Sequence, residues 1–180
     1  MAEAPTGIGK TVATLYPALR AAPGLGLDKL FFVTAKTPGR QLALHALRTL
    51  RAGGAQPLRV LELTARDKAC EHPDKACHGQ SCPLAQGFYD RLGGARAAAL
   101  AAGDMAAPAL RALARDHQVC PYWLAQDLMR WADVVVGDYN HFFDVSAGLH
   151  ALAQEAEGRC AILVDEAHNL PDRARQMYSA

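Results

Sequence analysis

Short apolar runs alternate along the chain with longer stretches of helical periodicity. The runs at 30–35, 58–63, 134–136 and 161–163 have the length of β-strands and are rich in Leu, Val, Phe and Ile. Regular alternation of strands with helices is typical of a parallel sheet whose two faces are covered by helices. The pattern therefore predicts an α/β fold.

Helices are predicted where apolar residues recur every three or four positions. Residues 41–54 follow this spacing, and two glycines end the pattern. The leucines that carry it are Leu42, Leu44, Leu47 and Leu50. Residues 95–114 contain eleven alanines and are broken at Gly103 and Pro108, so they predict two helices. Further helices are predicted at 11–22 and 122–132, with a polar and aromatic loop after the strand at 134–136.

Residues 64–83 differ from the rest of the chain because they contain three cysteines and little periodicity of either kind. Such a segment buries little apolar surface, so hydrophobic packing alone does not order it. A metal centre would supply the missing order. We therefore interpret this segment as an insertion in the α/β domain.

The composition fits one globular domain with an insertion, since 51% of the 180 residues are hydrophobic and 21% are charged. No apolar run approaches the roughly 20 residues that cross a bilayer, and no secretory leader is recognisable. Five cysteines, odd in number and unevenly spread, favour metal binding or catalysis in a reducing compartment over a disulfide scaffold. A cytoplasmic location without a membrane partner is the expectation.

The net charge of +1 conceals an asymmetry. Between Lys29 and Lys75 there are nine Lys or Arg and only four Asp or Glu. A basic stretch of this kind can meet nucleic-acid phosphates. A solvated helix face is the simpler explanation of the charge when it is considered alone.

Residues 4–11, Ala-Pro-Thr-Gly-Ile-Gly-Lys-Thr, predict a phosphate-binding loop ahead of a helix. Its glycines can take backbone angles that point successive N–H groups at phosphate oxygens, and the helix N-terminus adds positive potential. Lys10 can reach the β- and γ-phosphates of ATP, and the Thr11 hydroxyl can ligate Mg²⁺. The strict pattern begins with Gly where this chain has Ala4, and a chance glycine-rich turn is the alternative.

A second motif, Val-Asp-Glu-Ala-His at 164–168, follows the last predicted strand. Carboxylates at the C-terminal end of a parallel strand lie where such sheets bind ligands. Asp165 can hold Mg²⁺ through water, and Glu166 can orient or deprotonate the attacking water. The alternative is an ordinary strand-to-helix turn with surface carboxylates, which the presence of both motifs in this order makes the weaker explanation.

Four cysteines are candidate ligands of one metal centre, and they are Cys70, Cys77, Cys82 and Cys120. Six, four and thirty-seven residues separate them in turn. Structural zinc usually uses tight pairs, and only the four-residue gap qualifies, whereas iron–sulfur clusters accept looser spacing. His72 and His78 keep zinc open, and four buried cysteines remain the non-metal alternative. Cys160 lies at the edge of a predicted core strand and is expected to be a small buried residue.

Taken together, EAPTGIGKT, the four-cysteine insertion, ADVVVGDYNHFFD and VDEAH resemble the XPD/DinG-like iron–sulfur superfamily 2 ATP-dependent DNA helicases, in that family's order over essentially the whole chain. The resemblance implies a RecA-like P-loop domain with a parallel sheet, interrupted by a small, mostly helical domain with a [4Fe–4S] cluster. It also implies ATP-driven, 5′-to-3′ unwinding of DNA, with the cluster domain near the point of strand separation.

The resemblance carries roles to individual positions. The ATP-binding motif corresponds to Ala4, Pro5, Thr6, Gly7, Gly9, Lys10 and Thr11, and Ala4 is normal in that family. Asp165 and Glu166 match the carboxylates that hold Mg²⁺ and activate water, and His168 matches the position that couples the state of ATP to DNA. The four cysteines named above match the cluster ligands.

Contacts with single-stranded or junction DNA are also implied by the resemblance. Thr34, Lys36 and Thr37 match a motif that touches the phosphate backbone, and a solvated loop lysine is the alternative for Lys36. Tyr139 and Phe142 lie in a loop where the family approaches DNA. Base stacking is possible there, and core packing is the expected role of Phe142.

The departures from the family predict that the chain is a fragment of a longer helicase. Only three residues precede Ala4, where the family has a strand and a glutamine motif, and about a dozen follow the VDEAH motif. The second RecA-like domain with its arginine finger is expected in the missing C-terminal part, so the isolated chain is expected to hydrolyse little ATP and to unwind no DNA. We expect the first motor domain at 1–63 and 126–180, with the cluster insertion at 64–125.

Two other functions compete with the helicase motor. One is a metal-stabilised nucleic-acid-binding module whose nucleotide site is vestigial. The other is a phosphate-loop ATPase that acts on protein or on no polymer.

Overall fold

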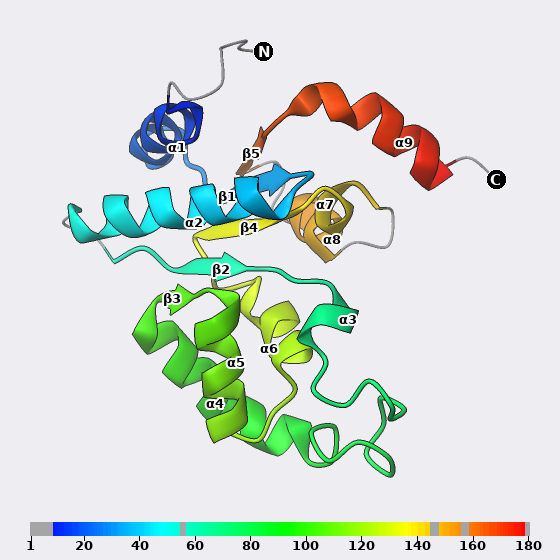
Figure 1. The fold of residues 1–180 in the computed structure, drawn as a ribbon. Helices are drawn as coiled ribbons and strands as arrows, with labels where there is room; N and C mark the ends of the chain where they lie inside the picture. Colours follow the sequence, from blue (N-terminus) through cyan, green and yellow to red (C-terminus); the bar gives the residue numbers. More distant parts are fainter. Residues whose placement is uncertain (1–8, 55–56, 145–147, 156–158, 179–180) are drawn as a thin grey trace. The chain divides into compact units, whose positions relative to one another are not determined.

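The fold of residues 9–54, 57–144, 148–155 and 159–178 is given by a computed structural model (Figure 1). The chain divides into two compact units. Unit 1 comprises Met1–Gln56 and Val136–Ala180, and unit 2 comprises Pro57–Val135. In the described part of the chain, no helix is both long and apolar enough to cross a bilayer.

Unit 1 has the strand order β4-β1-β5. Strands β1 and β5 run parallel, with Lys29 opposite Cys160 and Val33 opposite Val164. The elements in chain order are α1 (Lys10–Ala21), β1 (Lys29–Thr34), α2 (Thr37–Ala52), the end of β4 (Val134–Asp138), α7 (Asn140–Phe143), α8 (Gly148–Glu155), β5 (Cys160–Val164), the 3-10 helix η1 (Ala167–Asn169) and α9 (Leu170–Tyr178).

The core of unit 1 forms on β1, because every residue of this strand after Lys29 is buried. Phe31 packs against Phe142 of α7 with their ring centroids 5.7 Å apart, which confirms the packing role expected of Phe142. Helix α2 turns Leu44 and Leu47 inward, as its spacing predicts. Strand β5 ends the strand order, and Ile162 in its middle is 38% exposed.

Unit 2 has the strand order β3-β2-β4, to which β4 contributes its first two residues. Strands β2 and β3 run parallel, with Val60 opposite Asp104 and Leu61 opposite Met105. The elements are β2 (Val60–Glu62), α3 (Arg66–Ala69), α4 (Phe88–Ala102), β3 (Asp104–Met105), α5 (Ala107–Asp116) and α6 (Pro121–Leu128).

Two bidentate ion pairs connect elements of unit 2. Arg59 donates from Nη2 and Nε to the Asp133 carboxylate at 2.7 and 3.2 Å, and this joins the residues just ahead of β2 and β4. Arg96 of α4 donates in the same way to Asp127 of α6, while its guanidinium lies 5.6 Å from the ring centroid of Trp131. Planar guanidinium groups favour such paired geometry.

The α/β prediction is confirmed, and so are the two helices predicted within 95–114, which are α4 and α5. The break between them contains the two-residue strand β3, which pairs with β2 and which the sequence pattern does not predict. Two local expectations are wrong. The polar and aromatic stretch expected to be a loop after β4 contains the short helix α7. Leu42, expected on the apolar face of α2, is 61% exposed.

The cysteine-bearing stretch is as irregular as its sequence indicates. Helix α3 is four residues long, and residues 70–87 form only turns and bends. The compact units divide after residues 56 and 135, whereas the sequence predicts domain limits at 63 and 125. Those limits stay a prediction.

Candidate nucleotide-binding site

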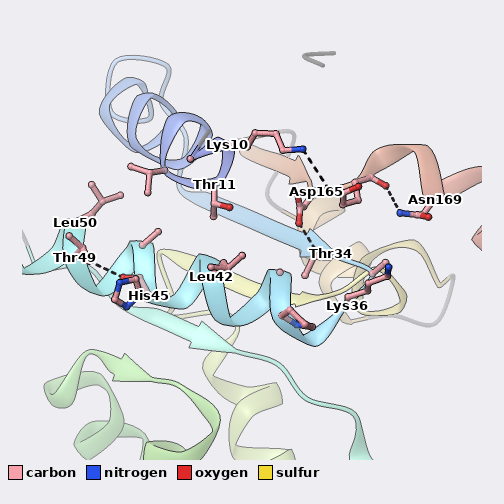
Figure 2. Close-up of a pocket in the computed structure, with 17 residues that line it drawn as sticks. Lys10, Thr11, Thr34, Lys36, Leu42, His45, Thr49, Leu50, Asp165 and Asn169 are labelled. Atoms are coloured by element: carbon pink, nitrogen blue, oxygen red, sulfur yellow. Dashed lines mark hydrogen bonds and ion pairs between the residues drawn. The ribbon is translucent and has the colours of Figure 1, made fainter. Parts of the chain in front are cut away.

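A cavity of about 760 Å³ lies in unit 1 beside the start of α1, the connection from β1 to α2 and the turn after β5 (Figure 2). Seven of the residues that the sequence singles out line it together, although they come from three distant parts of the chain. These are Gly9, Lys10, Thr11, Thr34, Lys36, Asp165 and Glu166.

Helix α1 presents its N-terminus to this cavity. Gly9 has φ 79° and ψ 29°, a left-handed conformation that glycine adopts without steric cost, and α1 begins at the next residue. The first N–H groups of a helix lack partners within it and carry positive potential, which favours an anion. Ala4, Pro5, Thr6 and Gly7 lie outside the described residues, so their predicted part in the loop stays a prediction.

Asp165 is held at the end of β5 by contacts from β1. Its N–H donates to the Val33 carbonyl oxygen at 2.9 Å, which extends the parallel pairing by one residue. Its Oδ2 accepts a hydrogen bond from the Thr34 hydroxyl at 3.2 Å. The carboxylate thus faces the cavity from the C-terminal edge of the strand, as Figure 2 shows.

Glu166 turns the chain sharply and meets the side chain of Lys10. Its backbone is left-handed, with φ 53°, and η1 follows at once. The Lys10 ammonium lies 3.7 Å from Glu166 Oε1, and His168 Nδ1 lies 3.5 Å from the other carboxylate oxygen. Both the lysine and the glutamate are about one-third exposed, so a charged ligand in the cavity can reach them.

His168 and Thr37 do not line the cavity, although both are close to it in sequence. The His168 side chain is mostly exposed and pairs with Glu166. Lys36 and Thr37 are exposed at the start of α2, where a strand of nucleic acid can reach them. Their predicted contact with DNA stays a prediction.

The expected contact of Tyr139 with DNA bases does not fit the structure. The tyrosine is 1% exposed, so neither face of its ring is available for stacking. Its hydroxyl contacts the backbone carbonyl oxygens of Asp165 and Glu166, the latter at 2.9 Å. Thr34 is likewise buried, at 2% exposure, and its hydroxyl is used by Asp165. Both side chains therefore belong to the carboxylate turn and not to the surface.

Sequence reasoning missed several residues that line this cavity, and two of them contact the carboxylate turn or its partner Thr34. Asn169 lines the cavity and donates from its backbone N–H, at 2.9 Å, and from its side-chain amide, at 3.1 Å, to the Glu166 carbonyl oxygen. Gly39 lines it as well, and a Cβ there would lie 2.5 Å from Thr34 Oγ1. An asparagine and a glycine near helix starts are too common for the sequence to have marked either one.

A separate, narrow cavity in unit 2 collects the cysteines that the spacing pattern groups together. Its lining includes Cys70, Cys77, Cys82 and Cys120. Cys70 ends α3 and Cys120 caps α6, while the turns between 70 and 87 supply the other two. Cysteine thiolates are the ligands of iron–sulfur clusters and common ligands of zinc.

The same cavity bears on the histidines and on the fifth cysteine. His72 lines the cavity. His78 does not line it, and Cys160 is a half-buried residue of β5 in unit 1 that does not line it either. Burial raises the pKa of the Cys120 thiol, and the neighbouring Cys70 and Cys82 add to this rise. Within the described residues, no three His, Cys, Asp or Glu are spaced as metal ligands, so binding a metal would require the thiols to close on it.

Comparison with known proteins finds several similar chains. The chain is 26% identical to the General transcription and DNA repair factor IIH helicase subunit XPD of Arabidopsis thaliana, over 93% of this chain and 26% of that protein. It is 29% identical to the Fanconi anemia group J protein homolog of Gallus gallus, over 85% of this chain and 13% of that protein. It is 25% identical to the Regulator of telomere elongation helicase 1 homolog of Anopheles gambiae, over 84% of this chain and 16% of that protein.

A solved structure described as XPD_Helicase has a similar fold. The TM-score is 0.62 at 21% identity, and the match covers 97% of this chain and 30% of that chain. The chain thus spans about a quarter or less of the curated relatives that it matches. The DEAD_2 family model matches residues 43–180, which is most of the sequence and includes the four cysteines and the carboxylate turn, so this chain belongs to the DEAD_2 family.

Proposed function

We propose that this chain is the ATP-binding part of an ATP-dependent DNA helicase that unwinds DNA in the 5′-to-3′ direction. The observation that carries the proposal is the meeting of Lys10, Thr11, Asp165 and Glu166 around one cavity. Membership of the DEAD_2 family supports the same activity. The names of its relatives include a helicase subunit of a DNA repair factor, which is consistent with a role in DNA repair.

The cavity supplies the groups that ATP hydrolysis needs from one motor domain. The N–H groups at the start of α1 and the Lys10 ammonium would bind the phosphate oxygens. A triphosphate would compete with Glu166 for Lys10, which lies 3.7 Å from it. Glu166 would then be free to orient a water molecule toward the γ-phosphate and to accept its proton.

Magnesium fits the oxygen donors on the same wall of the cavity. The Thr11 hydroxyl and the Asp165 carboxylate line it together, and hard oxygen ligands are the ones that Mg²⁺ prefers. When bound, the ion neutralises charge on the β- and γ-phosphates. Transition-state charge in such motors also needs an arginine from a second RecA-like domain, which we propose as the partner of this chain.

The Lys10→Ala variant tests the ATP site. In the whole protein, DNA-stimulated ATP hydrolysis should fall to background, because the ammonium that binds the phosphates is lost. Arg20→Ala is the matched control, since Arg20 is exposed in the last turn of the same helix and does not line the cavity. Full hydrolysis by Lys10→Ala would contradict the proposal. Binding of metal and DNA by a wild-type protein without ATPase activity would favour the metal-stabilised binding module instead.

We propose that the four cysteines of unit 2 hold a [4Fe–4S] cluster. The support is chemical, because four thiols from otherwise irregular turns line one cavity and such turns gain order from a metal centre. Iron and acid-labile sulfide would be measured after anaerobic purification. Cys120→Ser should lose iron, whereas Cys160→Ser, which alters the cysteine outside this cavity, should retain it. Stoichiometric zinc without iron would refute the cluster.

Single-stranded DNA is the polymer that we propose for the motor, and we propose that Lys36 contacts its phosphates. Lys36 is exposed at the N-terminus of α2 and also borders the nucleotide cavity. Lys36→Ala should weaken single-strand binding by a similar factor for every sequence, because a phosphate contact carries no base information. Unchanged affinity and salt dependence would contradict this contact.

A further inference from the structure

Two hydroxyl groups from different strands contact the short turn that carries the acidic pair. The Thr34 hydroxyl, at the end of β1, donates to Asp165 Oδ2 at 3.2 Å. The Tyr139 hydroxyl, just after β4, contacts the carbonyl oxygens of Asp165 and Glu166. One contact therefore fixes a carboxylate, and the other fixes the backbone that carries both carboxylates.

The Tyr139 contact is enclosed and cannot be exchanged readily for water. The tyrosine is 1% exposed. A phenol is protonated at neutral pH, so this hydroxyl is available as a donor. A donor here matters because Glu166 has the left-handed φ of 53°, which a residue with a Cβ adopts at a steric cost.

The Thr34 contact is enclosed by the first turn of α2. A Cβ on Gly39 would lie 2.5 Å from Thr34 Oγ1 and 2.9 Å from Asp165 Oδ2. The absence of a side chain at this position leaves just enough room for the hydroxyl and the carboxylate to meet. The direction of the Asp165 side chain is thus set by its neighbours before any ligand binds.

We propose that Thr34 and Tyr139 are positioning residues that hold the Asp165–Glu166 turn in the geometry that binds magnesium and orients water. This inference rests on the proposed function, because it assigns those two tasks to the carboxylates. It replaces the surface role in DNA binding that the sequence indicated for both residues. Each would act through the acidic pair.

The proposal is tested by the binding of a fluorescent ATP analogue to the whole protein, titrated with Mg²⁺. Thr34→Val and Tyr139→Phe each remove one hydroxyl at nearly constant volume. Both variants should require about tenfold more Mg²⁺ for half-maximal tightening of nucleotide binding, the order of effect typical of groups that orient metal ligands. Binding measured without Mg²⁺ should not change, because the start of α1 and Lys10 are intact.

Three controls separate positioning from general destabilisation. Thr34→Ser keeps the hydroxyl and should restore the wild-type Mg²⁺ dependence. Tyr89→Phe removes a phenol that is 85% exposed in unit 2 and should have no effect. Thr14→Val removes an exposed hydroxyl that bonds only within α1 and should also have none. Thermal unfolding of each variant is recorded alongside.

A wild-type Mg²⁺ dependence in Thr34→Val and Tyr139→Phe would overturn the inference, even if their melting temperatures fall. If Tyr139→Phe does not fold, Thr34→Val and Thr34→Ser still decide the matter for the side chain of Asp165. Failure of the proposed function looks different, because the wild-type protein itself would then bind no Mg²⁺–ATP and Lys10→Ala would change nothing.

Discussion

Adding one methyl group at Gly39 sets two opposing effects against each other. Gly39 lies in the first turn of α2 and does not have a positive φ, so alanine fits its backbone conformation. Replacing glycine by alanine within a helix usually stabilises a protein by about 0.5–1 kcal/mol, because glycine loses more backbone freedom on folding. Propensity alone therefore predicts that Gly39→Ala is stabilising.

Packing at Gly39 opposes that gain. The new Cβ would lie 2.5 Å from Thr34 Oγ1 and 2.9 Å from Asp165 Oδ2, whereas ordinary contacts begin at 3.4 Å. Thr34 is 2% exposed, so its hydroxyl must shift by about 0.9 Å within a packed environment. Overpacking of this kind costs about 1–3 kcal/mol, and loss of the hydrogen bond to Asp165 adds about 1–2 kcal/mol. The clash wins, and after the propensity gain is subtracted Gly39→Ala should be destabilising by about 1–4 kcal/mol.

Gly93→Ala provides the matched control for this prediction. Gly93 lies within helix α4 of unit 2, and a Cβ there would meet nothing within 4 Å. Only the propensity effect remains, so Gly93→Ala should stabilise unit 2 by about 0.5–1 kcal/mol. Both tryptophans, Trp123 and Trp131, lie in unit 2, so their fluorescence follows the control while circular dichroism follows both variants.

The measurement is thermal unfolding, in which about 1 kcal/mol corresponds to roughly 2–4 °C for a protein of this size. Gly39→Ala should melt several degrees below the wild type, and Gly93→Ala should melt slightly above it. If Gly39→Ala is as stable as Gly93→Ala, the close approach of Thr34, Gly39 and Asp165 is wrong, and with it the enclosure of the acidic turn.

Three other perturbations test side chains near the acidic turn in unit 1 and one ion pair in unit 2. Folding raises the pKa of Tyr139 to about 12. The protonated phenol therefore contributes fully to the free energy of unfolding below about pH 10, and this contribution is lost between about pH 10 and 12. In denaturant titrations, Tyr139→Phe should lose less stability over this range. Burial lowers the pKa of His141. The neutral imidazole therefore contributes fully to the free energy of unfolding above about pH 6.5, and this contribution is lost on acidification. His141→Gln should lose less stability at acid pH in the same titrations. Arg96→Lys loses the bidentate contact with Asp127, in which Arg96 Nε lies 2.7 Å from Asp127 Oδ2. This variant should lower the free energy of unfolding by about 1 kcal/mol and alter the fluorescence of Trp131.

Much of unit 1 could be predicted because its signals are local. The apolar run that becomes β1 and the leucine spacing of α2 are properties of neighbouring residues, and the structure follows both. Leu42 fits the same spacing yet is exposed and lines the nucleotide cavity. Periodicity indicates that a residue lies near an apolar face, but the boundary of that face is set by what packs against it.

The errors concern residues whose partners are distant in the sequence. Tyr139 follows a strand in a stretch that reads as a polar loop, and its hydroxyl meets carbonyl oxygens 26 and 27 residues later. Strand β3 is two residues long and forms only because β2 lies beside it. The cysteines show the converse case, since the four that their spacing groups together line one cavity, while their role as metal ligands stays a prediction. Residue type and spacing can indicate that several side chains gather at one site, whereas they do not indicate the partner of a single hydroxyl.

Strand β5 has a practical consequence for handling this polypeptide. Among the described strands it is the outermost of its unit, and Ile162 in its middle is 38% exposed. An edge strand that carries an exposed apolar side chain can pair with a strand of another copy of the protein. Dilute storage should keep preparations from aggregating, and light scattering measured against protein concentration would reveal whether it does.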